Sequence, residues 1–159
     1  MTTSATSPDA LDKRLRLEIY RQFMSLARAP LMAELATALH ASADEVKAAA
    51  KRLEAARMIV LQHESGELLM AAPLSAVPTQ FAVEVRTSQP PLYANCAWDA
   101  LGVPAMLHGD ARILASCACC GEAIQLMVKQ GKLETMPGGG IVCHFAVPPR
   151  HWWDDIVFT

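Results

Sequence analysis

The sequence places a thiol and a carboxylic acid three residues apart, at Cys96 and Asp99. They stand at the predicted start of a helix, where a spacing of three brings two side chains to one face. The dipole of a helix N-terminus favours the thiolate form of a cysteine. Asp99 could take the proton of Cys96 and return it to a leaving group. From these two residues alone, a small buried cysteine beside a solvated carboxylate is the simpler interpretation.

A second group of thiols lies in the run Cys117-Ala118-Cys119-Cys120-Gly121. Cys117 and Cys120 have the two-residue gap of zinc knuckles and redox pairs. Cys143 and His144 could complete a four-ligand zinc site, but their alternation along a predicted strand puts them on opposite faces. Small residues beside a turn are the simpler interpretation, and a zinc or auxiliary mercury site at Cys117 and Cys120 is the alternative.

The composition is that of a folded cytoplasmic protein. The chain has 159 residues, of which 52% are hydrophobic and 19% charged, and this excludes intrinsic disorder. The net charge of -2 gives no reason to expect a polyanionic or membrane partner. No apolar run is long enough to span a membrane, and the N-terminus lacks the features of a signal peptide. The odd number of cysteines, five, argues against a secreted disulfide scaffold.

Residues 1–9 are expected to form a disordered tail and residues 10–78 a winged-helix-like module. Apolar residues recur every three or four positions from Leu11 to Leu26, which is typical of one helical face. Pro30 fits the first turn of a second helix, and Ser42 with Glu45 forms a capping box that begins a third. Two apolar runs around a glycine-containing turn predict a β-hairpin. The expected elements are helices over 11–27, 30–39 and 42–57, and strands 59–61 and 68–70.

The order of these elements raises the question of DNA binding through the third helix. Residues 1–60 contain nine Lys and Arg against seven Asp and Glu, and phosphate contacts need clustered positive charge. DNA is therefore not an expected partner. A structural or dimerising use of the same module is the alternative.

Residues 79–159 are expected to form a small mixed domain after a linker-like stretch bracketed by Pro73 and Pro78. Alternating apolar residues predict strands, and one helix is predicted with an interruption near Gly102 and Pro104. The resulting fold class is α+β, with a largely antiparallel sheet after the helical module. The expected elements are strands 81–85, 112–116, 124–128 and 141–147, and a helix from 92 to about 107.

The run from Leu92 to Met106, which contains Cys96 and Asp99, resembles the active-site helix of the organomercurial (alkylmercury) lyase family. The run Ala111–Cys117 resembles the strand that follows in that family. The resemblance implies cleavage of carbon–mercury bonds, with release of a hydrocarbon and with Hg(II) left on thiolates. It implies that Cys96 is a mercury-binding thiolate, that Asp99 is the proton donor and that Cys117 is structural.

The chemistry of mercury agrees with these implied roles. Hg(II) is a soft cation that selects thiolate over oxygen and nitrogen donors. The resemblance implies a small organomercurial as substrate, Hg(II) as bound product, a mercuric reductase as a candidate acceptor of that ion, and no required cofactor. The alternative function is a winged-helix sensor whose thiols bind a soft metal without lyase activity.

The resemblance also implies a second active-site cysteine, placed just after a phenylalanine at the end of a short strand. Here Phe158 is followed by Thr159, the last residue of the sequence. Three explanations are open: a truncated sequence, a short natural variant with altered chemistry, or a selenocysteine codon read as a stop at position 160. The codon after Thr159 would distinguish them.

Overall fold

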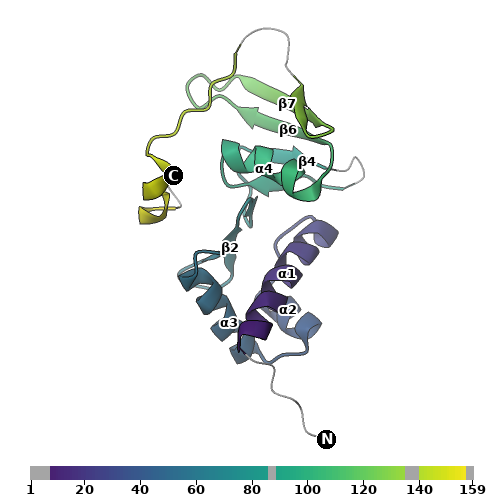
Figure 1. The fold of residues 1–159 in the computed structure, drawn as a ribbon, viewed down its shortest axis with the longest axis vertical. Helices are drawn as coiled ribbons and strands as arrows, with labels where there is room; N and C mark the ends of the chain where they lie inside the picture. Colours follow the sequence, from purple (N-terminus) through teal and green to yellow (C-terminus); the bar gives the residue numbers. More distant parts are fainter. Residues whose placement is uncertain (1–7, 86–88, 135–139, 157–159) are drawn as a thin grey trace, which may run out of the picture.

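The computed structural model describes residues 8–85, 89–134 and 140–156. Three N-terminal helices are followed by an eight-stranded antiparallel sheet and one further helix, so the predicted α+β class is confirmed (Figure 1). The strand order is β1-β2-β3-β5-β4-β6-β7-β8. No helix in the described ranges is long and apolar enough to cross a membrane.

The helix α1 spans Pro8–Leu26 and follows the predicted apolar face. Its side chains at four-residue spacing are buried, and only Leu26, predicted on the same face, is 42% exposed. Leu26 is the last residue of α1, and Ala27 adopts a positive φ of 52°, so the chain turns away from the core there. The buried residues are Leu11, Leu15, Ile19 and Phe23.

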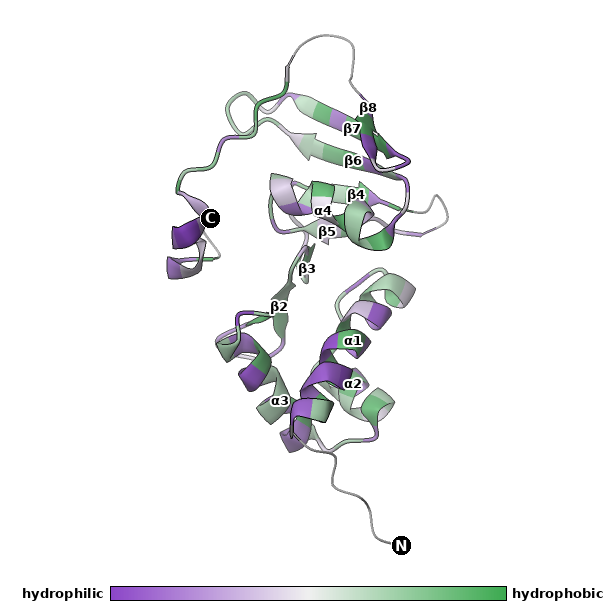
Figure 2. Cartoon of the chain, viewed as in Figure 1, coloured by the Kyte–Doolittle hydropathy of each residue, from purple (hydrophilic) through white to green (hydrophobic). Residues whose placement is uncertain are grey.

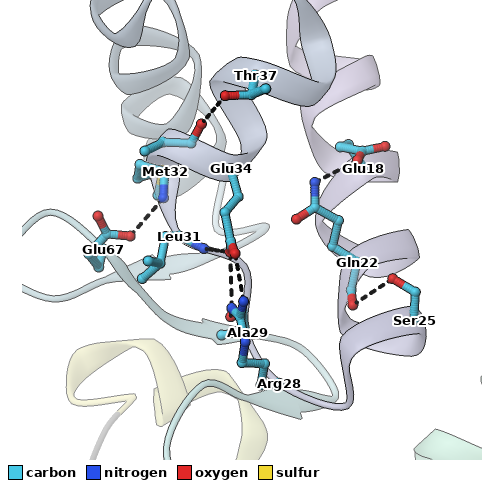
Figure 3. A network of polar contacts seen from close by, with 11 residues as sticks. Glu18, Gln22, Ser25, Arg28, Ala29, Leu31, Met32, Glu34, Thr37 and Glu67 are labelled. Carbon is cyan, nitrogen blue, oxygen red and sulfur yellow. Dashed lines mark hydrogen bonds and ion pairs between the residues drawn. The ribbon is translucent and has the colours of Figure 1, made fainter.

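The helix α2 spans Met32–Leu39, so Pro30 lies before the helix and not in its first turn as predicted. Its start is set by two carboxylates that accept the first free N–H groups (Figure 3). Glu34 accepts the N–H of Leu31 at 2.8 Å, and Glu67 accepts that of Met32 at 2.8 Å. Because Glu67 lies in the later hairpin, this bond also joins α2 to the sheet.

Figure 3 also shows how the connection before α2 is held. Arg28 donates two hydrogen bonds to Glu34, at 2.9 and 2.6 Å, and a third to the carbonyl of Ala29. The guanidinium of Arg28 and the N–H of Leu31 lower the pKa of Glu34 to about 2. Glu34 therefore stays ionised and serves both the helix start and the ion pair.

The helix α3 spans Ala43–Ala55 and begins at the predicted capping box. The Ser42 hydroxyl accepts the N–H of Glu45 at 3.3 Å, and the Glu45 carboxylate accepts the N–H of Ser42 at 2.8 Å. The helix ends two residues before the predicted limit. Its inner face consists of the buried residues Val46, Ala49, Ala50 and Leu53.

The predicted hairpin is confirmed as β1, Val60–Leu61, and β2, Leu68–Ala71. The stretch expected to be a linker contains a strand, β3, Leu74–Ser75, which pairs with β2 on one side and β5 on the other. Both residues of β3 are buried, and this double pairing explains why a two-residue segment is a strand. One sheet therefore continues from the hairpin into the second half of the chain.

The other strands of the sheet up to residue 134 are β4 at Ala82–Glu84, β5 at Leu92–Ala94, β6 at Ala111–Ser116, β7 at Ala123–Lys129 and β8 at Lys132–Glu134. Of these, β4, β6 and β7 correspond to the predicted strands 81–85, 112–116 and 124–128, whereas β5 and β8 were not predicted. Figure 2 shows mostly hydrophobic residues along β2 and β6 and long polar stretches along α1. The apolar residues of the sheet thus supply much of the core that positions the fourth helix.

The helix predicted over 92–107 is wrong in its first part and in its interruption. Leu92–Ala94 is the strand β5, and the helix α4 spans Ala97–Leu107 without a break at Pro104. Because proline lacks a backbone N–H, Pro104 removes one helical hydrogen bond, the one to the carbonyl of Ala100. The packing of the buried helix face outweighs the cost of that lost bond. Gly102 lies beside Pro73, where an added Cβ would make an ordinary contact with the Pro73 Cβ at 3.5 Å.

The predicted strand 141–147 is wrong. Residues 140–147 form no strand, and Ile141 and Val142 are exposed, because no neighbouring strand in the described part of the chain pairs with them. A 3-10 helix, η1, follows at Pro149–Asp154. Alternating apolar residues predict a strand only where a partner edge is available.

Candidate active site and thiol hairpin

Cys96 lies at the N-cap of α4, directly after the strand β5. Its sulfur accepts the backbone N–H of Asp99 at 3.4 Å, which is the bond that an N-cap side chain makes to the first turn. The predicted placement at the start of a helix is therefore confirmed. The carboxylate of Asp99 in turn accepts the side-chain N–H of Asn95 at 3.2 Å. The short segment 95–99, between the end of β5 and the first turn of α4, therefore holds the amide, the thiol and the acid together.

Burial raises the pKa of the Cys96 thiol. The N–H of Asp99 lowers it, the negative charge of Asp99 raises it, and the N–H of Trp98 lowers it less. The helix N-terminus alone favours a thiolate, but the loss of solvent around the half-buried sulfur has the larger effect. Free Cys96 is therefore a thiol at neutral pH, which differs from the sequence-based expectation.

Burial also raises the pKa of Asp99, while hydrogen bonds from Asn95 and Cys96 lower it. The acid is held closer to its protonated form than an exposed aspartate. A thiol and a carboxyl in contact, each disfavoured as an anion, can hold one proton between them. This arrangement can take a proton from sulfur when a metal binds and donate it to a nearby atom.

Asn95 is a site residue that was not predicted from the sequence. Its amide donates to Asp99, and its Oδ1 is buried with no hydrogen-bond partner among the described residues. The available signal was its position just before the N-cap, from which an amide reaches the acid at the third helical position. Asn95 is a positioning residue for Asp99.

The aromatic side of the site joins α4 to the C-terminal segment. The rings of Trp98 and Phe145 meet edge to face with centroids 6.4 Å apart, and Phe145 also packs against Trp152 at 5.4 Å. Trp98 is nevertheless 63% exposed. Trp98 therefore contacts the C-terminal segment through its ring contact with Phe145 while most of its side chain faces solvent.

Cys117 begins the turn between β6 and β7. Its N–H donates to the carbonyl of Glu122 and its own carbonyl accepts the N–H of Gly121, both at 2.8 Å. Gly121 has a φ of +74°, which a glycine adopts without strain. Backbone N–H groups of Cys120 and Cys119, and then the Cys120 side chain, hydrogen-bond the Cys117 sulfur and lower its pKa. These N–H groups form a cradle that stabilises negative charge on the Cys117 sulfur.

The alternative four-ligand set of Cys117, Cys120, Cys143 and His144 is not assembled. Within residues 8–85, 89–134 and 140–156, no three or more His, Cys, Asp or Glu side chains are grouped so that they could hold a metal ion. Cys143 is exposed on the segment that forms no strand. The thiols of Cys117, Cys119 and Cys120 therefore belong to no four-ligand zinc site among the described residues.

The register of the sheet relates the two thiol groups. β4 lies between β5 and β6, and Ala82 of β4 pairs with Tyr93 on one side and Leu114 on the other. Cys96 and Cys117 each follow three residues after those partners. Because neighbouring strands are about 4.8 Å apart, β5 and β6 lie roughly 10 Å from each other on the two sides of β4. Both strands end at the same end of the sheet, and Cys96 and Cys117 follow them there. Thr159 lies outside the described residues.

The comparisons with known proteins assign the segment that contains these residues to a family. The family model for alkylmercury lyase, MerB, matches residues 74–159, which is more than half of the chain and includes Cys96, Asp99 and Cys117. The chain belongs to the alkylmercury lyase family. The mercury-bound form of MerB2, solved by crystallography, matches with a TM-score of 0.58 and 25% sequence identity.

The match to MerB2 covers 79% of this chain and 66% of that chain, just under two thirds. A search of curated proteins finds no match. Family membership thus rests on the second half of the sequence, and the likeness of fold extends beyond it.

Proposed function

We propose that this chain is a carbon–mercury lyase that cleaves small organomercurials by protonolysis. The observation that carries the proposal is the contact of the Cys96 thiol with Asp99, whose N–H lies 3.4 Å from the sulfur. This contact lies within the segment that the alkylmercury lyase model matches. In this proposal Cys96 binds mercury and Asp99 is the proton donor.

The first step is the binding of an alkylmercury cation by Cys96. The S–H bond breaks, an S–Hg bond forms, and the proton goes to the Asp99 carboxylate. Metal binding to a thiol releases its proton. Because the pKa of the Cys96 thiol is raised, a nearby group that accepts this proton helps the metal to bind. Asp99 is that acceptor, and burial favours its protonated form.

The second step transfers the proton from Asp99 to the carbon bound to mercury. The electron pair of the carbon–mercury bond forms the new carbon–hydrogen bond, and Hg(II) stays on the sulfur. No oxidation state changes, and the proton gained by carbon is the one lost by the thiol. A thiol-bearing acceptor, for which a mercuric reductase is a candidate, then removes the ion.

The proposal is tested with methylmercury and excess glutathione, by measuring methane in the headspace. We expect the unmodified chain to release methane, and Asp99→Asn to slow the release by at least about a hundredfold while methylmercury still binds. Cys96→Ser should lose both binding and release. Asp44→Asn, on exposed α3, is the matched control and should release methane normally. Methane release by Asp99→Asn at the unmodified rate would contradict the assignment.

The second candidate function is the winged-helix sensor. The confirmed order of three helices and a hairpin favours it. However, Arg52 of α3 is paired with Asp12 at 2.6 Å, and Arg57 lies over the ring of Trp153 at 5.7 Å. Two of the cations that could meet phosphates are thus engaged within the molecule. A gel-shift measurement with and without Hg(II) tests this function, which predicts a metal-dependent change in DNA affinity.

A further inference from the structure

We propose that Cys117 and Cys120, in the β6–β7 turn, form a dithiol site that binds Hg(II) separately from Cys96. The two residues are three apart in a turn closed by the bonds of Cys117 to Glu122 and Gly121, both at 2.8 Å. The turn that the bond from Gly121 to the Cys117 carbonyl closes brings Cys117 and Cys120 close together, and the Cys120 side chain contributes to the lowered pKa of Cys117. The site does not depend on lyase activity at Cys96.

The number of donors selects the metal. Zinc requires four protein ligands in a structural site, and no such set exists among the described side chains. Hg(II) is satisfied by two thiolates and is softer than zinc, so it prefers sulfur over other donors. A pair of thiols without further ligands therefore fits Hg(II) and does not fit a structural zinc ion.

The turn also supplies stabilisation of the bound form. The backbone N–H groups of Cys119 and Cys120 point at the Cys117 sulfur and stabilise negative charge on it. Cys117 is half-buried, whereas Cys120 is exposed and gives the ion access from solvent. On binding, two S–H bonds break and two S–Hg bonds form, both protons go to water, and no group is oxidised or reduced.

The thiol of Cys119 provides the internal comparison. Cys119 is exposed, as Cys120 is, and serves the cradle through its backbone N–H. Replacing its side chain leaves that N–H in place. If the pair is Cys117 and Cys120, the two exposed cysteines will differ sharply in their effect on mercury binding, although they are neighbours in the sequence.

The test uses the full-length chain with Cys96→Ser and Cys143→Ser, so that the hairpin holds the remaining thiols. Reduced protein is given one equivalent of HgCl2 and titrated with glutathione, and the bound ion is counted by native mass spectrometry. Two thiols in one turn act at a high effective concentration, so we expect one ion per chain to be retained. Adding Cys120→Ser should lower the glutathione concentration that removes the ion by about a hundredfold.

Adding Cys119→Ser to the same background should leave that glutathione concentration unchanged. Circular dichroism confirms that each variant is folded, which is expected because both replaced side chains are exposed. Equal losses in the Cys119 and Cys120 variants, or retention of the ion in the Cys120 variant, would overturn the proposal. The proposal would also be overturned if the protein with Cys96→Ser and Cys143→Ser lost Hg(II) at the same glutathione concentration as the protein that carries Cys120→Ser in addition. Because Cys96 is absent throughout, these outcomes are independent of methane release.

Discussion

At the scale of single residues, burial decides the ionisation of Cys96. The spacing of Cys96 and Asp99 and their placement at a helix start could be predicted from the sequence. The direction of the Cys96 pKa could not, because it depends on how much solvent the folded chain removes from the sulfur. The same limit applies to Asn95, whose role depends on a side-chain contact with Asp99.

The opposite pKa directions of Cys96 and Cys117 predict different pH profiles for alkylation. A raised pKa means that Cys96 becomes a thiolate, the reactive form, only as the pH rises above the range of an ordinary cysteine. A lowered pKa means that Cys117 reacts already at lower pH. Iodoacetamide labelling of the native chain at a series of pH values, read by peptide mass spectrometry, measures both profiles.

Urea-unfolded protein is the control for that measurement, since the two profiles should coincide there. A native Cys96 profile at or below that of Cys117 would show that the helix N-terminus outweighs burial.

At the scale of elements, local signals predicted the helical module better than the C-terminal segment. The capping box at Ser42 and the four-residue spacing in α1 depend on neighbours in sequence, and both are confirmed. The strand expected at 141–147 requires a partner edge, which no local pattern supplies, and it is absent. The strand β3 was missed for the converse reason, since two distant partners make a strand of two residues.

The capping box of α3 predicts a measurable stability loss. Ser42→Ala removes the hydroxyl that accepts the N–H of Glu45, so we expect the free energy of unfolding to fall by about 1 kcal/mol. Ser42→Asp restores a good cap and should recover most of that loss. Urea unfolding followed by circular dichroism measures all three proteins, and an unchanged midpoint for Ser42→Ala would argue against the cap.

At the scale of the whole molecule, one sheet connects the helices to the candidate active site. Leu74 of β3 pairs with Ala94 of β5, two residues before Cys96, and it is fully buried. The boundary expected near residue 78 therefore falls within a continuous run of paired strands. The sequence could place the two halves in order, but not the strand that joins them.

This connection predicts that Leu74→Ala destabilises both halves together. The cavity should cost about 2–5 kcal/mol, since the side chain is fully enclosed. Circular dichroism reports mainly the N-terminal helices, and tryptophan fluorescence reports the second half, because all three tryptophans follow residue 79. Both signals should shift to lower urea by the same amount.

Leu17→Ala is the matched control, because Leu17 is 71% exposed and its loss should change little. A shift of only one of the two signals for Leu74→Ala would mean that the halves unfold independently.

The central claim is that Cys96 and Asp99 deliver a solvent-derived proton to the carbon of an organomercurial. The most direct measurement is mass spectrometry of the gas released from methylmercury by the full chain in D2O. The proposed mechanism predicts methane with one deuterium, released by the unmodified chain and almost absent with Asp99→Asn. Bound methylmercury with no methane from the unmodified chain, or equal release by both proteins, would contradict it.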